Sequence, residues 1–182
     1  VFVCVELPGQ IPAALKATKR IGVADWKLLA LTPHLEYALE KLGRTYNRPE
    51  DYHSEEEINQ VGLADLDRLD TFCDMVDPML QRQWALLAEH DIRPASLNWY
   101  HLKIRFNWVS IRALILRRGL EEERPNRVLY FGTREEPVTR ELFFVRESVW
   151  SRIIPAVCSA LNIQCETVGG YSDPSVLNRY PN

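Results

Sequence analysis

Six polar residues that can bind a ligand or exchange a proton follow apolar runs of this sequence. Glu6 stands at the end of the first run, where a buried carboxylate costs free energy unless it is paired or reaches solvent. His34 lies in the first turn of a predicted helix, directly after the second run. Parallel strands place their carboxyl ends at one edge, where open α/β sheets bind ligands, so we predict a binding site there. Later apolar runs supply the remaining four candidates: Thr133, Arg134, Arg146 and Ser148.

Each of these residues also has a purely structural interpretation. Glu6 either faces a cleft or forms a local cap or ion pair, and His34 is either a ligand or an exposed histidine beside a helix cap. The free amides of a helix that begins near Ser148 can hold an anion, with Arg146 adding positive charge. Turn formation and helix capping explain the same strand-end residues without a ligand. The sequence leaves both interpretations open.

The sequence lacks the motifs that carry a specific catalytic mechanism. It has no dinucleotide-binding glycine pattern, no phosphate-binding P-loop, no His-Glu-x-x-His and no Gly-x-Ser-x-Gly. Its acidic pairs offer too few oxygens for a hard cation, so we predict exposed charges, no bound metal and no cofactor. These pairs are Glu50 with Asp51 and Asp74 with Asp77. Four cysteines without a Cys-x-x-Cys pair or a His at ligand spacing are predicted to be buried free thiols: Cys4, Cys73, Cys158 and Cys165.

Apolar runs alternate with helical patterns along the chain. Such alternation predicts an α/β fold, with an open and mainly parallel sheet that carries helices on its faces. The runs are almost uninterrupted, as expected for strands covered on both sides. The predicted strands lie near residues 1–7, 26–31, 127–131 and 163–168.

The helices between these strands have readable boundaries. After the second strand, Thr32 can cap a helix, Pro33 suits its first turn, and Gly43 can end it in the left-handed conformation. Further helices are predicted at residues 11–21 and 148–161, the latter bent at its proline. Residues 142–145 are either a short strand or the approach to that last helix.

A long and mostly helical insertion is predicted at about residues 54–118. Ser54 and Glu57 fit a capping box that starts its first helix. Gly62 is expected to interrupt this helix, and Pro78 either kinks it or begins the next one.

The predicted helix at residues 96–118 is apolar on two opposite sides. If one side packs on the sheet or on neighbouring helices, the other needs a second cover. We expect residues 54–90 to supply it, with self-association through a partner chain as the alternative. Basic residues on the flanks also suit the surface of a membrane, or else they surround a buried helix and pair with acidic residues of the insertion. One stripe contains Trp99, Leu102, Phe106, Val109, Ala113 and Leu116, the other Ile104, Trp108, Ile111 and Ile115, and the cations are Lys103, Arg105, Arg112, Arg117 and Arg118.

Bulk properties narrow the class of protein. The chain has 182 residues, which suits a single domain with an insertion. Its net charge of -3 argues against a nucleic-acid-binding protein. No apolar stretch approaches the roughly 20 residues that cross a bilayer, and no signal peptide is visible, so a cytoplasmic location is expected. A first residue other than Met and a linker-like segment from Gly169 indicate one domain of a longer protein.

Several segments together resemble the amino-terminal domain of bacterial surface-carbohydrate biosynthesis proteins. The resemblance covers most of the chain but includes no catalytic motif. It rests on residues 31–33, 38–43, 50–52 and 55–57, on Tyr46, Gly62 and Asp77, and on the later residues Glu147, Ser148, Trp150, Ser151 and Ile153.

This resemblance implies a three-layer, Rossmann-like fold and a glycosyltransferase of the type that has two such domains. In that type the amino-terminal half faces a sugar or polysaccharide acceptor, a second Rossmann-like domain holds the nucleotide-sugar, and no metal is generally needed. The chain alone is then expected to be inactive. Two alternatives are a stand-alone binding or assembly module and a small enzyme that binds a nucleotide-sugar.

Overall fold

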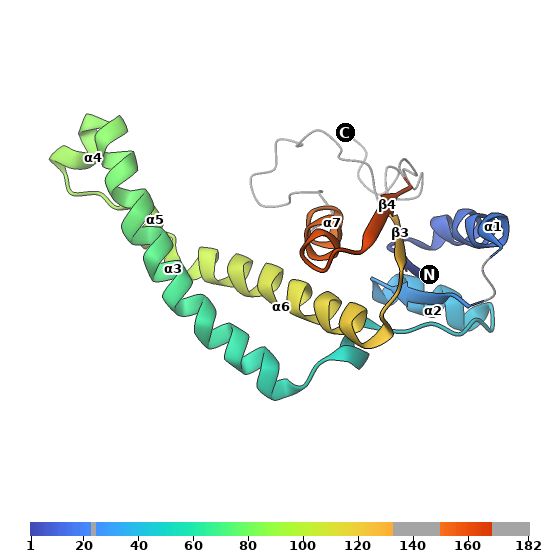
Figure 1. Ribbon diagram of the computed structural model, residues 1–182. Helices are drawn as coiled ribbons and strands as arrows, with labels where there is room; N and C mark the ends of the chain where they lie inside the picture. Colours follow the sequence, from blue (N-terminus) through green and yellow to red (C-terminus); the bar gives the residue numbers. More distant parts are fainter. Residues whose placement is uncertain (23–24, 133–149, 169–182) are drawn as a thin grey trace. The chain divides into compact units, whose positions relative to one another are not determined.

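The chain forms two compact units. The computed structural model describes residues 1–22, 25–132 and 150–168. One unit, here called the sheet unit, comprises Val1–Tyr52 and Ile115–Asn182, and the other, the helical unit, comprises His53–Leu114. Their boundary falls within one helix, α6 (Trp99–Glu123), which begins in the helical unit and ends in the sheet unit (Figure 1).

The sheet unit is mixed α/β and contains a four-stranded sheet. The strands β1 (Phe2–Val5), β2 (Lys27–Ala30), β3 (Arg127–Phe131) and β4 (Gln164–Thr167) lie in the order β2-β1-β3-β4. Every neighbouring pair is parallel. The four predicted strands and their parallel arrangement are therefore confirmed.

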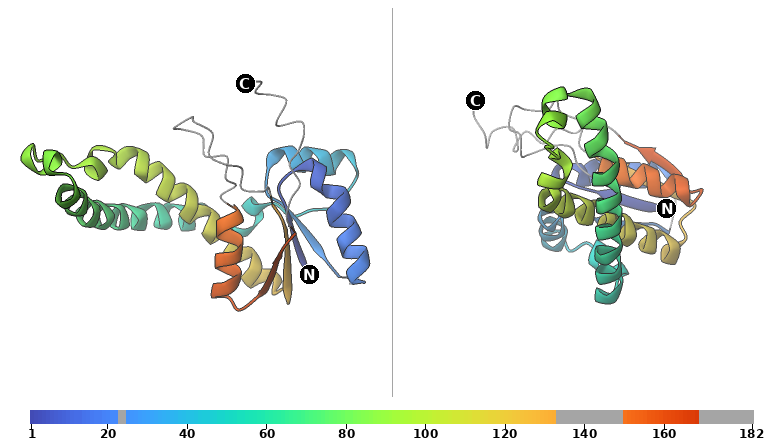
Figure 2. Two further views of the ribbon diagram at one scale, coloured as in Figure 1. Left: turned by 90° about the horizontal axis from the view of Figure 1, so that it is seen from above. Right: turned by 90° about the vertical axis from the view of Figure 1, so that its left-hand side faces the viewer.

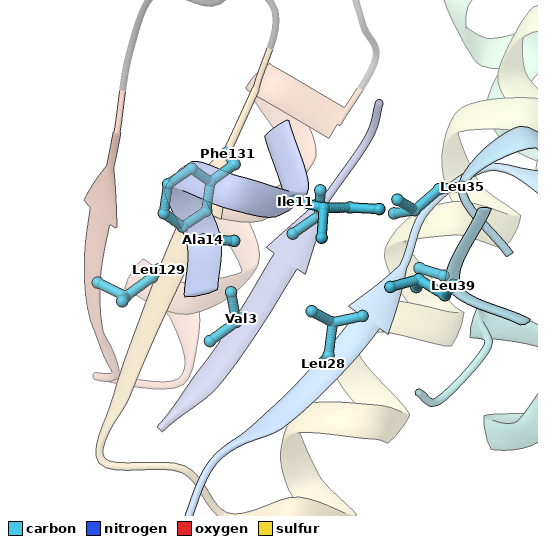
Figure 3. Packing of buried hydrophobic residues seen from close by; sticks show 10 residues of the cluster. Val3, Ile11, Ala14, Leu28, Leu35, Leu39, Leu129 and Phe131 are labelled. Carbon is cyan, nitrogen blue, oxygen red and sulfur yellow. The ribbon is translucent and has the colours of Figure 1, made fainter. Parts of the chain in front are cut away.

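Two helices cover one face of this sheet. The helices α1 (Ile11–Ile21) and α2 (Pro33–Lys41) direct Ile11 and Leu35 toward the strand residues Val3 and Leu28, as Figure 3 shows. The predicted boundaries of α2 are confirmed, since the Thr32 hydroxyl accepts a hydrogen bond from the amide of Leu35 and Gly43 has a φ of 61°. The buried cluster on this face consists of Val3, Val5, Ile11, Ala14, Leu28, Ala30, Leu35, Leu39, Leu129 and Phe131.

The opposite face is covered by the end of α6 and by α7 (Trp150–Ala160), which lies across the sheet from α1 in the left view of Figure 2. Tyr52, at the end of the 3-10 helix η2 (Pro49–Tyr52), packs its ring edge-on against Phe2. Gly119 of α6 approaches this tyrosine so closely that an added Cβ would lie 3.1 Å from the ring. Helices on both faces explain why β1, β2 and β3 are apolar at nearly every position. β4 lies at the edge of the sheet, and its residues are mostly polar and exposed.

The helical unit contains α3 (Glu55–Gln83), α4 (Ala85–Glu89), α5 (Pro94–Leu97) and the first part of α6. The capping box at Ser54 is confirmed, with both reciprocal bonds to Glu57 present. The expected interruption at Gly62 is wrong, because α3 continues through it and through Pro78. A glycine in place of alanine inside a helix lowers the stability of the helix by only about 1 kcal/mol, which the rest of α3 can offset. A Cβ added at Gly62 would lie 4.0 Å from the side chain of Asn107 in α6.

The second apolar stripe of α6 was expected to be buried by residues 54–90, but the structure leaves part of it exposed. Leu69 and Cys73 of α3 pack against the first stripe, at Trp99, Leu102 and Phe106. Trp108 of the second stripe is 41% exposed. The prediction that residues 54–90 cover this stripe is therefore wrong. α3 can contact only one side of α6, and α4 and α5 pack against α3.

The start of the predicted helix at residue 96 is wrong for a specific reason. A short helix, α5, precedes α6, and Asp77 of α3 caps it. The Asp77 carboxylate accepts bonds from the amides of Ala95 and Ser96, at 2.7 and 3.1 Å, and from the Ser96 hydroxyl at 2.5 Å. Burial alone would raise the pKa of Asp77, but these donors hold it below its ordinary value. Asp77 was predicted to be an exposed charge, and it is instead a buried cap.

Replacing Asp77 by Ala is expected to destabilise the helical unit by about 2 kcal/mol, because three donors lose a charged acceptor. A carboxyl whose pKa is lowered by folding stabilises the folded protein fully at pH values above its pKa in the unfolded chain, which is about 3.9. This stabilisation is lost as the pH falls through the pKa of the folded protein. Urea unfolding at neutral pH and near pH 3 measures the difference. The exposed Asp74→Ala is the control, and an equal effect of both changes at neutral pH contradicts the assignment.

Candidate functional site

The strand order identifies one point of the sheet where a ligand is expected. The chain leaves β1 toward β2 on one side and later returns to β3 on the other. At such a switch point the connections separate, and open α/β sheets bind ligands outside the carboxyl ends of the strands there. Glu6 follows β1 directly and therefore lies at this point.

Glu6 is held by side chains from three other elements. Its amide donates to the Gln10 side-chain oxygen at 3.0 Å, and its carbonyl accepts from the Thr32 hydroxyl at 2.6 Å. Its carboxylate accepts from the Tyr130 hydroxyl at 3.0 Å. The residue is only 4% exposed. A carboxylate fixed in this way is positioned before any ligand arrives, as binding and catalytic groups generally are.

Gln10 belongs to the 3-10 helix η1 (Pro8–Gln10), which connects β1 to α1. Its side-chain oxygen accepts from the amides of both Glu6 and Leu7. These two donors determine the orientation of the side-chain amide, so its NH₂ group points away from them. That nitrogen is buried and has no hydrogen-bond partner within the described part of the chain. A buried donor without an acceptor is uncommon and suits a polar ligand or a water molecule.

Tyr130 reaches Glu6 because Gly132 leaves room for its ring. Tyr130 is fully buried in β3, on the face that carries Phe2 and Cys4. A Cβ at Gly132 would lie 2.5 Å from both Cζ and the hydroxyl oxygen of Tyr130. Any larger residue at 132 must therefore move the ring, and with it the hydroxyl that binds Glu6.

Two of the predicted site residues, Glu6 and His34, lie at this edge of the sheet in the structure. Glu6 lies at the carboxyl end of β1, and His34 lies in the first turn of α2 with its side chain exposed. Among the described residues, no hydrogen bond or ion pair connects His34 to Glu6. The other four candidates fall outside the described residues, so their roles stay predictions: Thr133, Arg134, Arg146 and Ser148.

Sequence reasoning did not include Gln10 and Tyr130 in the site, and it treated Thr32 only as a cap. One signal was available. A tyrosine inside an otherwise apolar strand needs a partner for its hydroxyl, and Glu6 ends the neighbouring strand. For Gln10 the only signal is its position four residues after Glu6, and for Thr32 nothing in the local pattern indicates a bond across to β1.

Two cysteines that are separate in the sequence come together on the α7 face of the sheet. Cys158 of α7 is buried, as predicted. The prediction that Cys165 is buried is wrong, because β4 lies at the edge of the sheet and leaves this residue partly exposed. The Cys158 thiol donates a hydrogen bond to Cys165, which lowers the pKa of Cys165 and raises that of Cys158. Burial raises the pKa of Cys4 and of Cys73. Among the described residues, no three His, Cys, Asp or Glu side chains form a group that could hold a metal ion.

Two open hollows lie elsewhere on the molecule. One, of about 390 Å³, is at the amino ends of the strands beside Trp26, where Lys27 pairs with Glu123 at 2.5 Å. The other, of about 520 Å³, lies beside α5 at Ile92 and Leu97. Neither contains Glu6, and neither has a convergent set of buried polar groups. We therefore place the candidate site at Glu6, where such groups do converge.

Comparison with protein-family models, with curated proteins and with solved structures gave no match to this chain.

Removing the Tyr130 hydroxyl with Tyr130→Phe is expected to destabilise the sheet unit by about 1 to 2 kcal/mol, because the buried carboxylate loses a donor. Gly132→Ala should cost more, since the added methyl displaces the whole ring. Urea unfolding measures both changes. Tyr37→Phe, at an exposed tyrosine of α2, is the matched control, and a loss as small as this control shows would contradict the role given to Tyr130.

Cys165 is expected to be the fastest of the four cysteines to react with iodoacetamide near neutral pH, because its pKa is lowered and it is partly exposed. Cys158→Ala removes the donor and should slow that reaction. Mass spectrometry of the alkylated peptides gives the rate at each cysteine. Cys73→Ala is the control, and an unchanged Cys165 rate in the Cys158→Ala protein would show that the hydrogen bond has no such effect.

Proposed function

We propose that the sheet unit is a three-layer, Rossmann-like domain and forms the acceptor-side half of a glycosyltransferase-like protein of surface-polysaccharide biosynthesis. Two observations support this proposal. The parallel sheet has its switch point between β1 and β3, and a buried polar cluster lies at that point. The sequence segments that resemble such proteins point in the same direction.

The observation that carries the proposal is the fixed carboxylate of Glu6. A sugar hydroxyl both donates and accepts hydrogen bonds, so a carboxylate and a nearby NH₂ group complement it. Glu6 supplies the acceptor and Gln10 the donor. When an acceptor hydroxyl forms a glycosidic bond it loses its proton, and a carboxylate within hydrogen-bond reach can receive that proton. Glu6 is the group we assign to binding the acceptor.

On this proposal the nucleotide-sugar binds to a second Rossmann-like domain, and this chain binds the acceptor without transferring sugar to it. A binding experiment is therefore the appropriate test. We expect saturation-transfer NMR to detect oligosaccharide acceptors with the chain, and to show a signal at least severalfold weaker with Glu6→Gln. Glutamine keeps the shape of the side chain and can still accept from Tyr130, so the fold should be preserved.

Glu89→Gln, at an exposed residue of α4, is the matched control for the loss of one negative charge. Equal oligosaccharide signals from the unmodified chain and Glu6→Gln would overturn the assignment of Glu6. Binding of nucleotide-sugars in preference to oligosaccharides would favour the alternative of a small nucleotide-sugar-binding enzyme. Sugar transfer by the purified chain would contradict the division of roles between two domains.

A further inference from the structure

One side of α6 in the helical unit exposes large apolar side chains. Tyr100, Ile104 and Trp108 are 65%, 51% and 41% exposed, and they follow one another at intervals of four residues. This spacing places them along one side of the helix, together with the partly buried Ile111. α3 packs on a different side, at Trp99, Leu102 and Phe106. The exposed side is here called the outer stripe and consists of Tyr100, Ile104, Trp108 and Ile111.

The charged residues that α6 itself contributes beside the outer stripe are basic. Between Trp99 and Leu114 the helix has Lys103, Arg105 and Arg112 and no acidic residue, although the whole chain has a net charge of -3. The Lys103 ammonium lies 5.6 Å from the ring centre of Trp99, and the Arg112 guanidinium lies 4.0 Å from that of Trp108. Arg112 is thus held beside a ring of the outer stripe, and Lys103 beside the ring of Trp99 on the side that packs against α3. Acidic residues of this unit are concentrated on α3 instead.

We propose that the outer stripe binds the surface of an anionic lipid bilayer. Aromatic rings of Trp and Tyr favour the boundary between headgroups and acyl chains, and flanking cations attract anionic headgroups. No helix in the described part of the chain is long and apolar enough to cross a membrane, which fits a helix that lies along the surface. The proposal is independent of the ligand assigned to Glu6.

The distribution of charge also decides between a bilayer and a second copy of this chain. If two outer stripes packed together, the cations on their flanks would face each other, and like charges at an interface oppose association. An anionic bilayer neutralises the same cations. α3 also exposes apolar residues, such as Met75 and Met79, but it carries several carboxylates. An anionic bilayer would repel those carboxylates, so this side of the unit does not suit it.

Cosedimentation of the full chain with vesicles tests the proposal. One set of vesicles contains phosphatidylcholine alone, and the other contains equal amounts of phosphatidylcholine and phosphatidylserine. We expect binding to the anionic vesicles only, and weaker binding at high salt because the screening length falls from about 8 Å at physiological ionic strength to about 3 Å at 1 M. Replacing all three cations by Gln should weaken binding about a hundredfold, since each contributes about fivefold near the surface.

A second variant, Ile104→Ala with Trp108→Ala, should weaken binding about tenfold while leaving the thermal melt unchanged, because both side chains are exposed. Met75→Ala with Met79→Ala is the matched control on α3 and should bind as the unmodified chain does. Equal binding to both kinds of vesicle, or an equal loss in the α3 control, overturns the proposal. So does a chain that binds no vesicles but self-associates through the outer stripe, as sedimentation velocity would show.

Discussion

β1 is the strand on which the rest of the sheet unit depends. It pairs with β2 on one side and β3 on the other, and helices cover both of its faces, so all four of its residues are buried. A strand in this position can carry no unpartnered polar group. The first polar side chain after it is Glu6, at the point where the regular ladder ends. Gln10 and Thr32 then bind the amide and the carbonyl of Glu6. The candidate site thus arises from the need to satisfy the backbone at the end of a buried strand.

Different interactions stabilise the interior of each unit. The sheet unit has large buried clusters of aliphatic and aromatic side chains, whereas the buried cluster of the helical unit consists of Leu69, Cys73 and Ala95. Polar contacts contribute correspondingly more there. Asp65 is fully buried on α3 and binds Arg68 and the Ser110 hydroxyl, both at 2.9 Å. A small cluster also leaves one side of α6 exposed, which is the side that we assign to a lipid surface.

Much of the sheet unit was predictable from short stretches of sequence. Buried parallel strands show as apolar runs, and Thr32, Pro33 and Gly43 mark the ends of α2 by conformational preferences that act within a few residues. The same reasoning was less successful for the helical unit. Gly62 and Pro78 are unfavourable inside a helix, but contacts along the remainder of α3 outweigh their local cost. The parallel sheet follows from the pattern, and the pairing order of its strands does not.

For the candidate site, the sequence by itself determined that Glu6 closes a buried strand, because a carboxylate after an apolar run is visible locally. Only the tertiary structure decided which groups hold it. Tyr130 is 124 residues away and Thr32 is 26, so their bonds to Glu6 form only after the strands are paired in register. The approach of Cys158 to Cys165 likewise depends on how α7 packs against β4. Helical periodicity revealed two apolar stripes on α6, but which stripe α3 covers was decided by packing, since either side of that helix is apolar enough to be buried.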